Sequence, residues 1–233
     1  MNLTTRLLAP LAVALGTATA PAWAHDNGGD SYRELSAQWW QWALSIPVGS
    51  NPLLDPTRPD DPTAKNCMVG QRGKIWFLAG ALGGGTVRRT CTVPAGVTLF
   101  IPVINTFWLD TPGVCGQGAA LTVPEMRAQL APFIDAATGL EVKVDSMPVT
   151  DIRRSRSVPF LAALPKRNLF LEACGGDLPS GVYSPSLADG YYVKVEGLAP
   201  GVHTVDFKGK SGSFELDVGY VLTVSPVSDR VKY

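Results

Sequence analysis

The chain has 233 residues, and its 20 Lys and Arg balance 20 Asp and Glu, so the formal net charge at pH 7 is zero. No basic stripe runs along the sequence, which argues against nucleic acid or an anionic membrane surface as a partner. The length suits a single domain with a substantial core.

The first 24 residues have the pattern of an export signal. Arg6 provides the positive start, residues 7–20 an apolar core, and Ala22-Trp23-Ala24 a small-x-small cleavage site. The apolar run is interrupted by prolines and is too short for a stable membrane anchor, and no later segment is long and apolar enough to span a bilayer. We therefore expect a secreted or periplasmic protein in which residues 25–233 form one domain.

Ser31 and Glu34 form an S-x-x-E capping box, which predicts a helix over about residues 31–46 that ends at Pro47. Trp40 lies about 100° from its neighbour around the helix axis and so points away from the centre of the apolar face. The residues of that face recur at spacings of three and four; they are Tyr32, Leu35, Trp39, Trp42, Ala43 and Ile46.

The loop 48–66 follows, and loops of this length in a compact domain are often functional. The next segments, 74–79 and 97–104, are the most strand-like in the chain, and Pro102 indicates an edge or bulged strand. A glycine turn at 83–85 predicts that 88–93 returns as the hairpin partner of 74–79.

Four cysteines fit an oxidising compartment and allow three disulfide pairings. We favour Cys67–Cys91 and Cys115–Cys174, because the first pair would join the entry of the predicted hairpin to its exit. None of the four belongs to a CxxC pair, so a structural zinc site is not expected.

Thr122 and Glu125 form a second capping box, which predicts a helix to about residue 137 with a buried seam. From Gly139 onward, short alternating segments separated by turn residues predict strands. The fold class is therefore mainly β: an immunoglobulin-like or jelly-roll-type β-sandwich with two packed α-helices, at about 31–46 and 123–137. The basic cluster 153–156 is interpreted as a solvated loop or strand edge.

Several segments of the chain resemble an uncharacterised family of secreted bacterial proteins. The resemblance rests on WWQWALSIP (39–47), NPLLD (51–55), GQRGKIWFLAG (70–80) and CTVPAG (91–96). It implies export and a shared fold but no catalytic residue. The segment 189–207 also looks like the closing hairpin of immunoglobulin-like bacterial domains, which is an analogy of fold alone.

Nucleophile elbows, phosphate-binding loops and HExxH motifs are missing from the sequence. Two enzyme alternatives remain. A glycoside hydrolase could use paired carboxylates among Asp55, Asp60, Asp61 and Asp110, although loop aspartates more often make turns.

The second alternative is a copper-dependent redox enzyme or copper carrier. Cleavage after Ala24 would leave His25 at the mature N-terminus, where its α-amine and imidazole could chelate copper. His203, the other histidine, would complete the ligand set. Apart from copper in this alternative, no cofactor is expected.

Aromatic side chains support a third interpretation, in which flat rings bind a sugar or peptide. We expect a binding protein rather than an enzyme, with an extracellular glycan or an envelope protein as its partner. The ligand-binding candidates are Trp40, Trp108, Asp110, Asp55 and Asn51.

Overall fold

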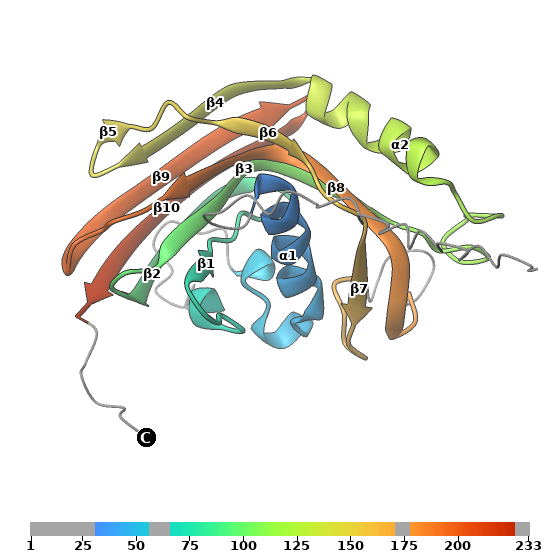
Figure 1. The fold of residues 1–233 in the computed structure, drawn as a ribbon, viewed down its shortest axis with the longest axis horizontal. Coiled ribbons are helices and arrows are strands. Elements are labelled where there is room, and N and C mark those ends of the chain that lie inside the picture. Colours follow the sequence, from blue (N-terminus) through green and yellow to red (C-terminus); the bar gives the residue numbers. More distant parts are fainter. Residues whose placement is uncertain (1–30, 56–65, 171–177, 227–233) are drawn as a thin grey trace, which may run out of the picture.

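The computed structural model describes residues 31–55, 66–170 and 178–226. It confirms a mainly β protein in which two sheets pack together and two α-helices flank them (Figure 1). The helices are α1 (Tyr32–Ser45) and α2 (Val123–Asp135). The strands are β1 (Ile75–Phe77), β2 (Gly85–Pro94), β3 (Thr98–Leu109), β4 (Ala137–Val144), β5 (Met147–Pro148), β6 (Arg153–Arg156), β7 (Phe160–Leu164), β8 (Gly181–Val195), β9 (Gly201–Ser211) and β10 (Phe214–Ser225).

Both sheets are mixed. Sheet A has the order β1-β3-β8-β6, with β7 also paired to β8, and sheet B has the order β2-β10-β9-β4-β5. The β1–β3 and β2–β10 pairs are parallel, and all other strand pairs are antiparallel. The sandwich is confirmed, whereas its immunoglobulin-like character is not, because the sheets of that fold are antiparallel.

The predicted hairpin between 74–79 and 88–93 is wrong, because β1 and β2 belong to different sheets. Strand β1 has only three residues, whereas β2 pairs with β10 along its whole length, from Gly85 to Pro94. The long ladder satisfies far more backbone groups than a hairpin with β1 could. The glycine turn therefore carries the chain from one sheet to the other.

The segment 189–207 is also not a closing hairpin. Its two strand portions lie in β8 of sheet A and β9 of sheet B, and β9 pairs with β4 and β10 instead. Two further short segments that the alternating pattern after Gly139 predicted as strands are not strands: residues 149–152, which follow the two-residue β5, and the described part of the segment that begins at Asn168.

Sheet A is buried on both faces. Ile101 and its cross-strand partner Val193 face sheet B, and both are fully buried. Phe100 and Tyr192 point the other way, toward α1, and stack with ring centroids 5.0 Å apart. The molecule thus has three layers and two apolar cores that share one sheet.

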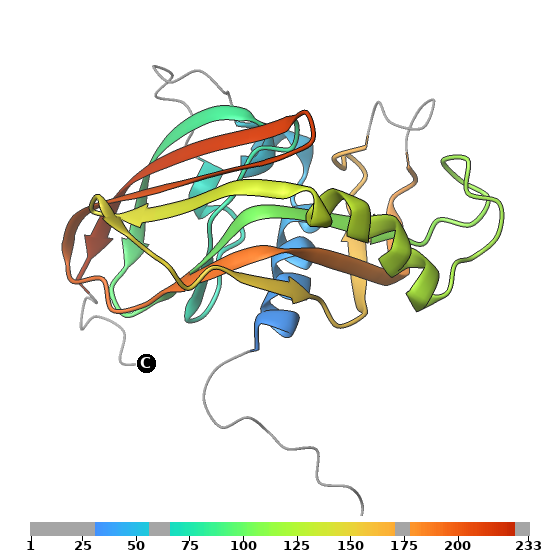
Figure 2. The same ribbon diagram turned by 90° about the horizontal axis from the view of Figure 1, so that it is seen from above.

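Helix α1 crosses the outer face of sheet A at a steep angle to the strands (Figure 2). Ser31 caps it as predicted, with Glu34 completing the capping box. Two tryptophans anchor it through their indole N–H groups: Trp39 donates to the Leu78 carbonyl at 2.9 Å and Trp42 to the Val69 carbonyl at 2.8 Å. Pairing buried indole donors in this way avoids the cost of leaving them unsatisfied.

Helix α2 covers the end of β3 and β8 that projects beyond sheet B (Figures 1 and 2). The Thr122–Glu125 capping box is confirmed, and Met126, Leu130 and Ile134 form its buried seam. Phe133 is half-buried and meets Phe214 edge-on at 5.7 Å. Neither helix of the described residues is long and apolar enough to cross a membrane.

The Cys67–Cys91 disulfide is confirmed, with 6.3 Å between the two Cα atoms. Cys115 is disulfide-bonded as well, and its predicted partner Cys174 lies outside the described residues. The predicted export signal and His25 also lie outside them.

Candidate functional site

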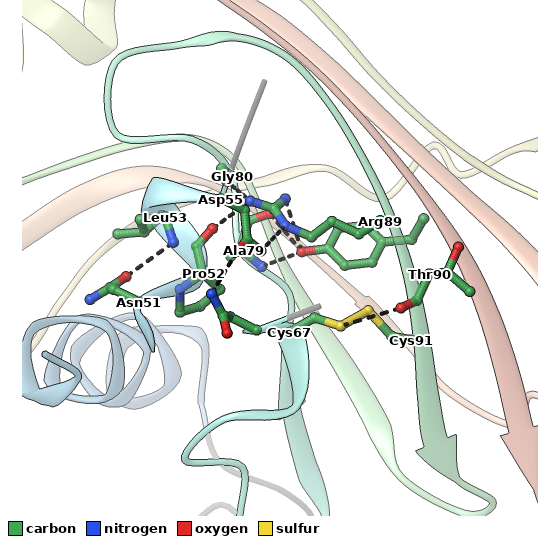
Figure 3. Close-up of polar contacts among 12 residues, drawn as sticks. Asn51, Pro52, Leu53, Asp55, Cys67, Ala79, Gly80, Arg89, Thr90 and Cys91 are labelled. Carbon is green, nitrogen blue, oxygen red and sulfur yellow. Dashed lines mark hydrogen bonds and ion pairs between the residues drawn. A yellow bond between two sulfur atoms is a disulfide. The ribbon is translucent and has the colours of Figure 1, made fainter. Parts of the chain in front are cut away.

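The geometry of the loop after α1 depends on a buried arginine from β2. Arg89 donates through Nε to Asp55 Oδ2 at 2.9 Å, and both side chains are almost fully buried (Figure 3). Its remaining N–H groups donate to the Tyr220 hydroxyl and to three backbone carbonyls, those of Pro52, Ala79 and Gly80. All five guanidinium donors are thus satisfied, which a buried charge requires.

This arrangement defines the positions of two ligand-binding candidates. Asp55 accepts from Arg89 and, through Oδ1, from Asn66 at 2.8 Å. Asn51 is also buried, and its amide donates to the carbonyls of Ala43 and Ile46 at the end of α1. Both side chains therefore hold the loop against the core.

A concave site lies beside this network, between α1, α2 and the end of the sandwich. We call it the aromatic cleft; its volume is about 230 Å³. Trp39 and Trp40 of α1 and Phe107 of β3 form part of its lining, together with the loop 80–82 and Leu53. Arg89 fixes the part of the lining formed by Leu53 and the loop 80–82. It donates hydrogen bonds to the carbonyl of Gly80, which lines the cleft, and to that of Pro52, which precedes Leu53.

Three buried polar groups meet near the aromatic cleft without standard hydrogen bonds. They are Trp40 Nε1, Asn105 Nδ2 and the Tyr192 hydroxyl, and the first two residues line the cleft. Burial raises the pKa of Tyr192 well above its usual value, whereas the neighbouring Asn105 and Trp40 side chains lower it. These neighbours are close enough to interact, but the geometry leaves Trp40 and Asn105 with unused donors.

Trp40 is the predicted candidate that the structure places in this site. It is only 4% exposed and packs on Phe107 with 4.1 Å between ring centroids. Asn105 was missed by sequence reasoning, since it lies in the middle of an otherwise apolar strand. An isolated amide within VINTF was the available signal, because buried polar groups need a partner.

Trp108 and Asp110 lie apart from the aromatic cleft. Trp108 packs beneath α2 with Met126, Leu130 and Leu187. Asp110 accepts hydrogen bonds from Gln117 Nε2 and the Leu121 backbone amide, and so orders the loop that leads into α2.

The described carboxylates do not form a hydrolytic pair. Asp55 is bound to Arg89, and Asp110 to its own loop, so neither side chain faces a cleft with the other. Asp60 and Asp61 lie outside the described residues.

His203 sits on β9 with both ring nitrogens engaged. Nδ1 is 2.7 Å from Asp145 Oδ2, and Nε2 is 2.9 Å from the Ala199 carbonyl oxygen. These two hydrogen bonds raise the pKa of His203, the Asp145 contact contributing most. The arrangement leaves no free lone pair for copper, and no group of three His, Cys, Asp or Glu side chains suited to a metal occurs in the described part of the chain.

Comparison with known proteins gives no functional assignment: no protein-family model and no curated protein matches the chain.

Proposed function

We propose that this protein is a secreted or periplasmic binding protein that holds one ring of a glycan in the aromatic cleft. The observation that carries the proposal is a pair of residues in the lining of an aromatic cleft, Trp40 and Asn105, whose buried donors Nε1 and Nδ2 have no standard hydrogen bond. A sugar presents an apolar ring face for stacking and hydroxyl oxygens that accept hydrogen bonds. Sites of this kind combine a mainly apolar lining with a few convergent polar groups.

The size of the aromatic cleft supports a single ring. Its volume of about 230 Å³ exceeds the ~150 Å³ cavity that holds one benzene molecule and is below the ~300–1,000 Å³ of sites for drug-sized ligands. The disulfides are consistent with an oxidising compartment, as export requires.

The test is calorimetric titration with a panel of neutral mono- and oligosaccharides, followed by two variants. Trp40→Phe keeps an aromatic ring but removes the indole donor, and Asn105→Ala removes the amide. Each should weaken sugar binding about tenfold, the effect of losing one or two hydrogen bonds. Intrinsic fluorescence should change on binding in the wild-type protein, because Trp39 and Trp40 line the site.

Trp42→Phe is the matched control. Trp42 lies on the same helix but does not line the aromatic cleft, and its indole N–H is already bonded to Val69. This variant should lose stability and keep its sugar affinity. The proposal fails if no sugar in the panel binds, or if Trp40→Phe and Asn105→Ala bind the sugar as tightly as the wild type.

A further inference from the structure

A second concave site lies at the free edge of sheet A, where an arginine-rich strand meets both helices. Its volume is about 480 Å³, and it is lined by Arg33 of α1, Arg127 of α2, and Arg154, Ser155 and Arg156 of β6. We call it the arginine cleft. Strand β6 passes beside the N-terminal turn of α1 in both views (Figures 1 and 2). The predicted strand edge at 153–156 is therefore confirmed, but it is part of a concave surface rather than a simply solvated one.

The strand register explains how two of the arginines are held. Arg154 and Arg156 alternate with Ser155, so they share one face of β6 with Asp189, the cross-strand partner of Arg156. Asp189 is 2% exposed and is bound in a bidentate manner by Arg154, at 3.2 Å and 2.9 Å. Arg154 also donates to Asp135 at 2.6 Å. Arg154 is thus held in place by two carboxylates.

The other three arginines keep unused donors. Arg156 approaches Asp189 only at 3.5 Å through Nε, and its side chain is 56% exposed. Arg127 donates Nη2 to the Ser157 carbonyl at 2.8 Å, and its buried Nη1 has no partner. Arg33 forms no ion pair within the described residues.

The described residues neither neutralise the positive charge of the arginine cleft nor pair all of its buried hydrogen-bond donors. Four guanidinium groups face two carboxylates, Asp135 and Asp189, which leaves two positive charges in excess. Burial lowers the pKa of Arg127, and repulsion from Arg33 and Arg156 lowers it further. The buried, unpaired Arg127 Nη1 and the excess positive charge both call for an acceptor that the described residues do not supply.

We propose that the arginine cleft binds a dianionic oxyanion of the phosphate or sulfate class. Arginine forks match the oxygen geometry of such groups, and charge-assisted hydrogen bonds to them are about twice as strong as neutral ones. A dianion would neutralise the two excess charges and accept hydrogen bonds from Arg33, Arg127 and Arg156. This inference is independent of the glycan site, because the two clefts share no lining residue.

The test is calorimetric titration of the full chain with sodium phosphate and sodium sulfate, at an ionic strength held constant with sodium chloride. A phosphorylated sugar, glucose 6-phosphate, forms a separate arm. Both inorganic anions should bind and raise the melting temperature, while chloride does neither. Tighter binding of glucose 6-phosphate than of phosphate would identify a phosphate ester as the source, and equal affinity would identify the free anion.

Arg33→Ala and Arg156→Ala should each weaken anion binding about tenfold, because both residues donate from exposed positions that folding does not require. Arg153→Ala is the matched control. It lies on the same strand and removes the same charge, but its guanidinium pairs with Asp151 and lies over the Tyr32 ring, away from the cleft. The proposal is overturned if phosphate acts no differently from chloride, or if Arg33→Ala and Arg156→Ala bind phosphate as well as Arg153→Ala does.

Discussion

Arg88 and Arg89 are adjacent on β2, yet their ion pairs have opposite environments. Arg88 pairs with Asp217 at 2.9 Å on the outer face of sheet B, where the two side chains are 39% and 51% exposed. Arg89 pairs with Asp55 at the same distance in the interior, where their side-chain exposure is 0% and 1%. Alternation along a strand puts consecutive side chains on opposite faces, so one step in sequence separates a solvated charge from a buried one.

Asp55→Asn should therefore destabilise the protein strongly, by about 3–5 kcal/mol in the free energy of unfolding, because it leaves the Arg89 charge buried without a counter-charge. Urea denaturation monitored by circular dichroism measures this loss. Asp217→Asn is the control and should change stability by no more than about 1 kcal/mol, as exposed ion pairs do. Similar losses for the two variants would show that the Arg89 pair is not a structural centre.

At the scale of elements, the β4–β5 turn is tied to the connection between the sheets. Asp145 and Ser146 form a two-residue turn with φ values of 49° and 67°, the left-handed pair typical of a type I′ hairpin. Asp145 accepts from the Thr204 backbone amide at 2.8 Å and from His203, whose other nitrogen meets Ala199. His203 thus links the β4–β5 turn to the loop that leads into its own strand, β9.

This link should make stability depend on pH. The pKa of His203 is raised, so its protonated form adds stability that is complete below about pH 6.5 and is lost as pH rises through the raised pKa. The pKa of Asp145 is lowered, mainly by the His203 hydrogen bond, so its contribution exists above about pH 4 and is lost as pH falls. The difference in melting temperature between wild type and His203→Ala should be largest between about pH 5 and pH 6 and shrink toward about pH 9.

NMR titration of the His203 ring protons measures the raised pKa directly. Asp145→Asn should return that pKa toward its ordinary value and remove most of the pH dependence. A melting-temperature difference that stays constant across this pH range would contradict the role given to His203.

Local sequence signals predicted both helices and the bulge in β3, whereas the pairing of strands that are distant in sequence could not be predicted. The two capping boxes located both helices to within two residues, because caps depend on side chains three positions apart. Pro102 correctly indicated a bulge, which the register shift in β3 confirms. The parallel β2–β10 pair could not be predicted, since its partners are more than 100 residues apart in the chain.

The same limit applies to the candidate sites. Trp40 was singled out because it is rotated off the apolar seam, and it does line the aromatic cleft. Asn105 and the arginine cleft were missed, because each site joins residues from separate elements that only the fold brings together. Arg89 was missed for a different reason. The sequence around a charged residue in a strand does not tell whether its side chain is buried or solvated.

At the scale of the whole molecule, sheet A couples the two cores. Each central strand sends alternate residues to opposite sides, so loss of sheet A would expose the inter-sheet core and the α1 core together. Three of the chain's six tryptophans lie on α1, and no strand of sheet B carries one. Fluorescence and circular dichroism can therefore follow different layers of the protein.

We expect all three layers to unfold as one cooperative unit. In a background with Trp23→Phe, Trp76→Phe and Trp108→Phe, fluorescence reports only on α1. Leu222→Ala removes a fully buried side chain from sheet B and should cost about 2–5 kcal/mol. Leu222 lies in the inter-sheet core, on the opposite side of sheet A from α1. The variant should nevertheless shift the fluorescence and circular dichroism midpoints in urea by the same amount, because coincident transitions are the mark of two-state unfolding. A fluorescence midpoint that stays in place while the circular dichroism midpoint falls would show that α1 and its core unfold independently of the sandwich.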